Sequence, residues 1–145
     1  MAKVFTSAVI NAPIEKVWAT VRDFNGMGGW HPAIKDSVIE GGLKSDNIGC
    51  VRRFSVEGLG QLREQLLALA DHEHYFTYSI LDAPMPVTGY VATLELHRIT
   101  DGNKTYAKWT AEFACPADQE AGLVDMVGNG VFQTAFTTLN QKLAG

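Results

Sequence analysis

The chain has 145 residues, of which 46% are hydrophobic and 19% are charged, and its formal net charge is −4. This length and composition exclude a disordered chain and predict one folded domain over residues 1–145. No run of lysine or arginine exceeds two residues. Nucleic acids and anionic membrane surfaces are therefore excluded as expected partners, because both are bound by concentrated positive charge.

The first ten residues, MAKVFTSAVI, lack the apolar core and cleavage site of a signal peptide. No apolar run reaches the ~18 residues needed to cross a bilayer. We therefore expect a cytoplasmic protein that does not insert into a membrane. Cys50 and Cys115 are only two and lie far apart in the sequence, so we expect free thiols rather than a disulfide.

The N-terminal part of the chain predicts a strand followed by two short helices. Apolar and polar side chains alternate over residues 3–10, which favours a strand. Residues 13–24 begin with a proline and then place apolar side chains at helical spacing, which predicts an amphipathic helix. Glycines at positions 26, 28 and 29 end this helix, and we expect a short helical turn around Trp30.

The middle of the chain consists of strand-like runs separated by short turns rich in glycine, aspartate and proline. The expected strands lie near residues 34–40, 49–57, 61–70, 74–82, 88–99 and 104–115. Short turns between consecutive strands predict an antiparallel meander. In the last strand the side chains from Ala107 to Cys115 alternate between apolar and polar, so one face of the sheet is expected to be covered.

Residues 119–143 supply the cover, because their apolar side chains follow helical spacing along one broad stripe. Gly128 and Gly130 lie near the middle of this predicted helix, where each costs about 1 kcal/mol relative to alanine. Together with Ala107 and Ala111, they either leave space for a cavity of about 300–1,000 Å³ or allow the helix to approach the sheet closely. The sequence supports both interpretations equally.

Several short motifs occur in a characteristic order along nearly the whole chain. They are Ala12-Pro13 with Val17-Trp18, Trp30-His31-Pro32, Gly49-Cys50-Val51-Arg52, Glu64-Gln65-Leu66, Tyr78-Ser79-Ile80, Gly89-Tyr90, Trp109 with Phe113, and Gly130-Val131-Phe132. With these motifs the chain resembles the START/Bet v 1-like (SRPBCC) superfamily, in its polyketide cyclase/dehydrase-like branch.

The resemblance implies an α+β helix-grip fold with an apolar ligand pocket. In this fold a curved seven-stranded antiparallel sheet wraps around a long C-terminal helix, and two short helices follow the first strand. One fold does not imply one chemistry, because members of this superfamily include carriers, hormone receptors and cyclases.

The chain is also distantly similar to plant abscisic acid receptors. This similarity places His31 where the receptors have a carboxylate-binding lysine, and it implies that Arg52, Glu64, Tyr78 and Tyr90 point inward. The receptors' gate loop, Ser-Gly-Leu-Pro-Ala, and their latch histidine and arginine are replaced here. Hormone reception is therefore not supported.

The alternation of side chains, independently of any resemblance, places Arg52 and Phe54 on the covered face of one strand and Glu64 on that of the next. A lone buried charge is costly, so we expect the arginine and the glutamate to pair. The pair is either an internal salt bridge that fixes strand register or a polar patch that orients a ligand, and both roles are compatible.

The candidate ligand-binding residues are those that the strand patterns, the helical stripe or the resemblance point inward. They are His31, Arg52, Phe54, Glu64, Tyr78, Ile80, Tyr90, Trp109, Phe113, Val127, Val131 and Ala135. We expect no cofactor and no metal. The only tempting histidine cluster, at residues 72–74, lies in a predicted turn without the spacing of a zinc site.

His31 is the candidate with the sharpest chemistry. Trp30 and Pro32 flank it, and the proline disfavours helical geometry for the histidine, so we expect the side chain to be held at the rim of the pocket. Its ordinary pKa of about 6.5 suits either donation to a ligand or movement of a proton. The alternative is a histidine that is bonded to the backbone or simply solvated.

Two functions of different classes follow. The first is a non-catalytic binder or carrier of a small hydrophobic or amphipathic molecule, such as a lipid, an aromatic or a polyketide-like compound, in a cavity between the sheet and the C-terminal helix. The second is a cofactor-independent cyclase, dehydratase or isomerase in which His31 acts as general acid/base. A weaker alternative is a protein-interaction module that uses the loops at 57–61 and 82–87, and a weak homodimer is a further expectation.

Overall fold

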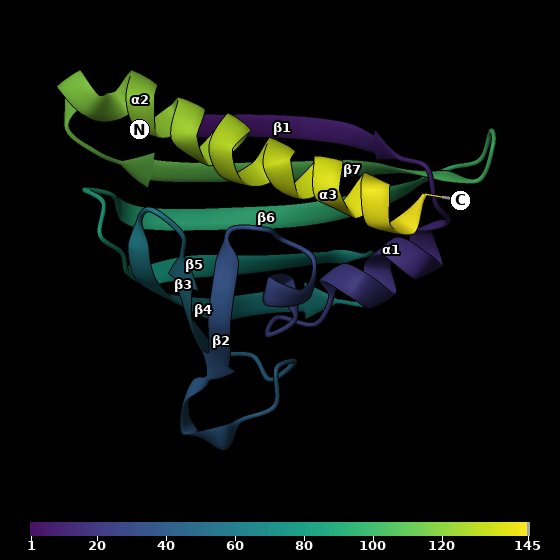
Figure 1. Cartoon of the computed structure of the whole chain (residues 1–145), viewed down its shortest axis with the longest axis horizontal. Coiled ribbons are helices and arrows are strands. Elements are labelled where there is room, and N and C mark those ends of the chain that lie inside the picture. The colour runs from purple at the N-terminus through teal and green to yellow at the C-terminus, as the bar shows by residue number, and fades with distance from the viewer. Residues whose placement is uncertain (145) are drawn as a thin grey trace.

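Seven antiparallel strands form one sheet in the order β1-β7-β6-β5-β4-β3-β2, and helices cover one of its faces (Figure 1). This arrangement comes from a computed structural model that describes residues 1–144. The strands are β1 (Ala2–Ile10), β2 (Ile34–Ile39), β3 (Val51–Val56), β4 (Gly60–Ala70), β5 (Tyr75–Asp82), β6 (Thr88–Ile99) and β7 (Lys104–Ala114). The helices are α1 (Ile14–Val21), α2 (Glu120–Asp125) and α3 (Thr134–Leu143), with a helical turn at Met27–Gly29. The predicted helix-grip fold and its strands are thus confirmed.

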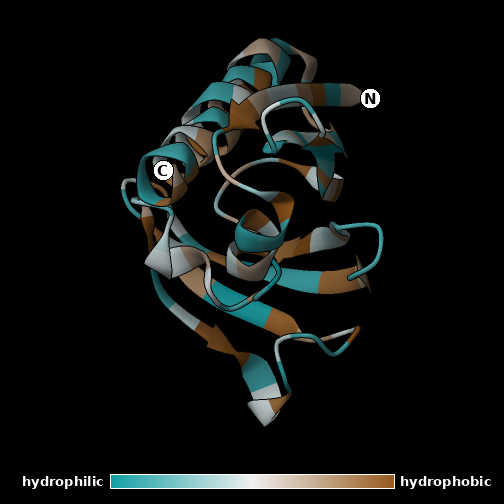
Figure 2. Ribbon diagram, turned by 90° about the vertical axis from the view of Figure 1, so that its right-hand side faces the viewer, coloured by the Kyte–Doolittle hydropathy of each residue, from teal (hydrophilic) through white to brown (hydrophobic). Residues whose placement is uncertain are grey.

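The sheet bends around the C-terminal helix, as the view along the fold shows (Figure 2). Alternation explains which side chains face inward: on β7, Ala107, Trp109, Ala111 and Phe113 are buried, while the residues between them are more exposed. The Trp109 ring stacks on Phe132 of the helix, with the ring centroids 4.3 Å apart. This stack attaches the helix to β7, which lies next to the edge strand β1.

The C-terminal helix differs from the uniform α-helix that the sequence predicts. Between α2 and α3 the segment Met126–Gln133 is π-helical, so the helical run is continuous but wider in its middle. Such segments are rare and occur frequently at functional sites. The period of the apolar stripe cannot distinguish the two forms over so few residues, which is why sequence analysis missed it.

The two central glycines of this helix have different surroundings. A Cβ atom added to Gly128 would lie 3.3 Å from Cγ1 of Val4 on β1, so this glycine allows close approach of helix and sheet. The interpretation that it leaves open space is wrong. Gly130 instead lines the pocket described below, and a Cβ there would meet nothing closer than 3.8 Å.

Two further features bear on the expectations from sequence. Cys50 and Cys115 are both free thiols. In residues 1–144, no helix has the length and apolar character that crossing a membrane requires.

The close approach at Gly128 predicts a position-specific effect of a larger side chain. Gly128→Leu should lower the free energy of unfolding by about 1–3 kcal/mol, because the new side chain overpacks the contact with β1. Gly122→Leu is the matched control, since this exposed helical position has no heavy atom within 4 Å of an added Cβ. It should gain up to about 1 kcal/mol from helix propensity. Chemical denaturation measures both, and equal effects of the two substitutions would contradict the packing described here.

Candidate functional site

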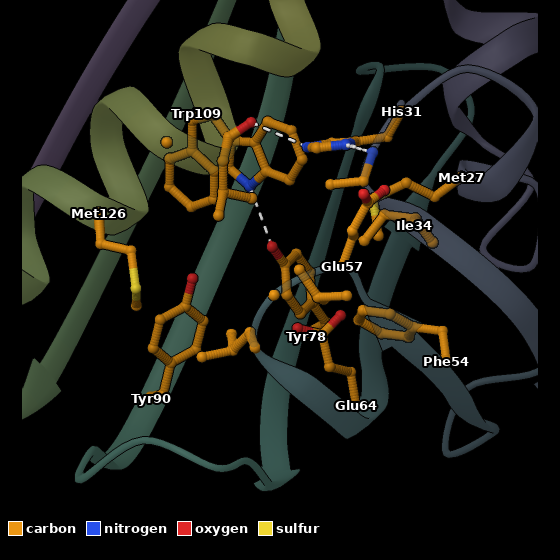
Figure 3. Close-up of a pocket in the computed structure, with 17 residues that line it drawn as sticks. Met27, His31, Ile34, Phe54, Glu57, Glu64, Tyr78, Tyr90, Trp109 and Met126 are labelled. Carbon is orange, nitrogen blue, oxygen red and sulfur yellow. Dashed lines mark hydrogen bonds between the residues drawn. The ribbon is translucent and has the colours of Figure 1, made fainter.

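A pocket of about 260 Å³ lies between the sheet and the C-terminal helix (Figure 3). Strands β3 to β7 supply one wall, with inward side chains that include Phe54, Glu64, Tyr78, Tyr90 and Trp109. The volume is slightly below the expected range of about 300–1,000 Å³. The wall is mostly aromatic, with few polar atoms.

The other side of the pocket is formed by the loop before β2 and by the π-helical segment. His31 and Ala33 come from the loop, while Met126, Gly130 and Val131 come from the helix. The turn between β3 and β4, residues 57–59, completes the lining. The pocket therefore brings together segments that are about a hundred residues apart in the chain, such as His31 and Val131, whose positions differ by 100.

Seven of the candidate ligand-binding residues line this pocket: His31, Phe54, Glu64, Tyr78, Tyr90, Trp109 and Val131. The other five lie outside its wall. They are Arg52, which is enclosed by aromatic rings; Phe113, which stacks behind Tyr90; Val127 and Ala135, which are buried in the core; and Ile80, which packs against the edge of the core.

Sequence analysis did not name several of the lining residues, including Met27, Ala33, Ile34 and Met126, as candidates. Met126 lies four positions before Gly130 on the apolar helix stripe, so helical spacing could have identified it. Met27 and Ala33 belong to a loop without a repeating pattern, and no sequence signal marks them.

The predicted contact between Arg52 and Glu64 is confirmed, and both side chains are buried. Nε of Arg52 donates to Oε1 of Glu64 over 2.9 Å, and Nη2 lies 2.7 Å from the same oxygen. Nη1 donates to the backbone oxygen of Phe24 over 2.9 Å. The guanidinium carbon lies 3.9 Å from the centre of the Phe24 ring and 4.9 Å from that of Tyr78. Arg52 is thus sealed behind the pocket wall.

Glu64 presents its second oxygen to the pocket. Oε1 makes both contacts with Arg52, whereas Oε2 accepts no hydrogen bond from any residue between positions 1 and 144. Burial raises the pKa of Glu64, and the charge of Arg52 opposes that rise. Since arginine stays protonated, a neutral Glu64 would leave a buried cation without a partner. The glutamate is therefore the anionic partner of Arg52 at neutral pH.

Two tyrosines provide hydroxyl groups to the same pocket. Nε1 of Trp109 donates to the hydroxyl oxygen of Tyr78 over 3.2 Å, which leaves the tyrosine proton available to another acceptor. Burial raises the pKa of both Tyr78 and Tyr90 well above the ordinary value of a phenol. Both therefore remain neutral hydrogen-bond donors at physiological pH.

His31 lines the pocket, but backbone groups engage both of its ring nitrogens. Nε2 lies 3.1 Å from the carbonyl oxygen of Val131, and Nδ1 accepts from the backbone N–H of Ala33 over 3.2 Å. Only the neutral ring with a proton on Nε2 satisfies both bonds. Burial lowers the pKa of His31, which agrees with a neutral ring. The expected alternative of a backbone-bonded histidine is therefore confirmed, although the residue is at the pocket.

This geometry limits what His31 can do. A general base needs a free nitrogen within hydrogen-bond reach of the proton it abstracts, and here the only nitrogen without a proton already accepts from Ala33.

For metals, the described residues contain no group of three or more histidine, cysteine, aspartate or glutamate side chains placed to hold an ion.

Comparison with known proteins agrees with this fold. The model of the family described as "Polyketide cyclase / dehydrase and lipid transport" matches residues 1–145. Abscisic acid receptor PYL10 of Arabidopsis thaliana is 32% identical over 99 residues, which are 66% of this chain and 53% of the receptor. The chain thus matches only about half the length of this relative.

Two solved structures resemble the whole fold. The protein XoxI from Bacillus cereus has a TM-score of 0.86 and 30% identity, with 99% of this chain and 96% of that chain covered. A protein from Thermobifida fusca has a TM-score of 0.88 and 28% identity, with 99% and 93% covered.

The buried pair predicts a large effect of a small change. Glu64→Gln should lower the free energy of unfolding by roughly 3–5 kcal/mol, because it leaves the charge of Arg52 buried without a counter-charge. Glu112→Gln is the matched control, since Glu112 pairs with Lys3 at 3.6 Å on the exposed face, where such pairs contribute little. Denaturant titration should show no measurable change for the control. A Glu64→Gln protein as stable as the wild type would show that the pair is not buried.

The bonding of His31 predicts that acid weakens the fold near neutrality. Below about pH 6.5 the unfolded chain protonates this histidine, whereas the folded chain, in which its pKa is lowered, does so only at lower pH. The free energy of unfolding should therefore fall as pH decreases through about 6.5 and level off below the folded pKa. His31→Gln should remove this component, while His72→Gln, in an exposed turn, should keep it. Equal pH profiles for the two variants would contradict the assignment.

Proposed function

The chain belongs to the polyketide cyclase/dehydrase and lipid transport family, and we propose that it binds a small, mostly apolar molecule in the pocket between the sheet and the C-terminal helix. One observation carries this proposal: the pocket is enclosed mainly by aromatic and aliphatic side chains, and only a few polar groups face it. Small-molecule sites are generally concave and apolar, with a few placed polar groups that fix orientation.

The similarity to a protein named as an abscisic acid receptor supports a small-molecule role in general terms. It does not support the same ligand, because the resemblance implies that His31 stands where the receptors have a lysine and that the receptors' gate and latch residues are replaced. A lipid, an aromatic or a polyketide-like compound remains within the proposed class.

Binding is favoured over catalysis by the state of His31. The alternative, a cyclase, dehydratase or isomerase, was built on this histidine as general acid/base. Both of its ring nitrogens are bonded to the backbone of Val131 and Ala33. Arg52, a cation that could stabilise negative charge in such a reaction, lies behind the wall. The proposed catalytic groups are thus occupied by structural contacts.

We also propose, from the sequence, that residues 1–145 form a single domain, that the protein is cytoplasmic and that it forms a weak homodimer.

Naphthalene, a rigid apolar probe without hydrogen-bonding groups, tests the proposal directly. We expect saturable shifts of the Trp109 indole and Val131 amide resonances in NMR titrations of the wild-type protein. Gly130→Leu should weaken binding by at least about tenfold, or about 1.4 kcal/mol, because the new side chain occupies the pocket that Gly130 lines.

Gly122→Leu is the control for this substitution, because Gly122 is exposed and does not line the pocket. It should leave the affinity unchanged. Absence of saturable binding to the wild type, or equal affinities for the two variants, would refute the proposed site.

A further inference from the structure

The charged side chains that line the pocket are all acidic. Within residues 1–144, no lysine or arginine side chain lines the pocket, whereas the carboxylate of Glu64 does. The other acidic group in the lining is Glu57, at the turn between β3 and β4. Its nearest cation, Lys35, lies 3.6 Å away, is well exposed and is not part of the lining.

The nearest buried cation is turned away from the pocket. Arg52 is 2% exposed, and its guanidinium lies among the rings of Phe24, Phe54 and Tyr78. Its bonds run to Oε1 of Glu64 and to the backbone oxygen of Phe24. The ion pair is therefore an oriented dipole whose negative end, the carboxylate of Glu64, lies at the cavity (Figure 3).

The remaining polar groups carry no charge that could balance an anion. His31 is neutral, and both of its ring nitrogens are engaged by the backbone. The hydroxyls of Tyr78 and Tyr90 can donate hydrogen bonds but are neutral. A ligand carboxylate would lose its hydration beside Glu64 without gaining a counter-charge, which is strongly unfavourable in a buried site.

A ligand hydroxyl, unlike a carboxylate, is expected to bind favourably beside Glu64. Oε2 of Glu64 is a charged acceptor that no residue between positions 1 and 144 satisfies. Hydrogen bonds to a charged acceptor are about twice as strong as neutral ones, so a ligand hydroxyl directed at this oxygen would form a strong hydrogen bond.

Building on the proposed function, we infer that the pocket selects uncharged aromatic ligands that carry a hydroxyl donor directed at Oε2 of Glu64, and that it rejects carboxylates. The aromatic preference follows from the rings of Phe54, Tyr78, Tyr90 and Trp109 that surround the cavity (Figure 3). Glu64 is thus a specificity-determining residue as well as the partner of Arg52.

Three probes with the same ring system separate these claims: naphthalene, 2-naphthol and 2-naphthoate, titrated into the wild-type protein at pH 7. We expect 2-naphthol to bind at least about tenfold more tightly than naphthalene, and 2-naphthoate at least about tenfold more weakly than naphthalene. Binding of 2-naphthoate as tight as that of 2-naphthol, or no gain from the hydroxyl over naphthalene, would overturn the inference. Failure of all three probes to bind would instead refute the proposed function.

A variant assigns the selectivity to Glu64. Glu64→Gln, once shown to be folded by its NMR spectrum, should reduce the affinity ratio of 2-naphthol to 2-naphthoate by at least about tenfold. Glu112→Gln, on the exposed face of β7, should keep the wild-type ratio. An unchanged affinity ratio in a folded Glu64→Gln protein would overturn the inference. If that variant does not fold, the three titrations of the wild-type protein are sufficient to decide the inference.

Discussion

The buried ion pair between Arg52 and Glu64 is the constraint on which the rest of the site depends. The two residues are direct cross-strand partners in the register of β3 and β4, and Arg52 also bonds to the backbone oxygen of Phe24 beyond α1. A shift of either strand by one residue would move the charged side chain of that strand to the other face of the sheet and separate the pair. Because an unpaired buried charge is far more costly than a paired one, the pair fixes the strand register and holds the segment after α1 against the sheet. It need not add to net stability in order to do so.

The orientation of this pair also determines the chemistry of the pocket. Aromatic rings cover the guanidinium, and the second carboxylate oxygen faces the cavity. The other polar groups that line the pocket from the loop and the strands are neutral. The ring of His31 bonds to the carbonyl of Val131 and so connects the loop before β2 to the π-helical segment. The phenols of Tyr78 and Tyr90 stay protonated. A pocket built in this way is suited to holding and discriminating a ligand. His31, the base on which the catalytic alternative depends, is bonded to the backbone through both ring nitrogens.

Much of the fold could be predicted from local patterns, because alternation and helical spacing directly report which side chains are buried. The pairing of Arg52 with Glu64 also followed, since alternation placed both charges inside and isolated buried charges are unfavourable. The bonds of His31 could not be predicted, because one partner is 100 residues away. The close packing of Gly128 depends on its distance to Val4, which no helix periodicity encodes. The π-helical segment changes backbone hydrogen bonds without changing the apolar stripe, and for this reason it left no signal in the sequence.

A double-mutant cycle on the central pair tests this account most directly. Unfolding free energies are measured for the wild type, Arg52→Met, Glu64→Gln and the double variant. If the two side chains satisfy each other in a buried site, each single change should be costly and the double change should cost much less than their sum. We predict a coupling free energy of at least about 2 kcal/mol. A coupling below about 0.5 kcal/mol, the range of independent sites, would show that the two side chains do not interact in the folded protein.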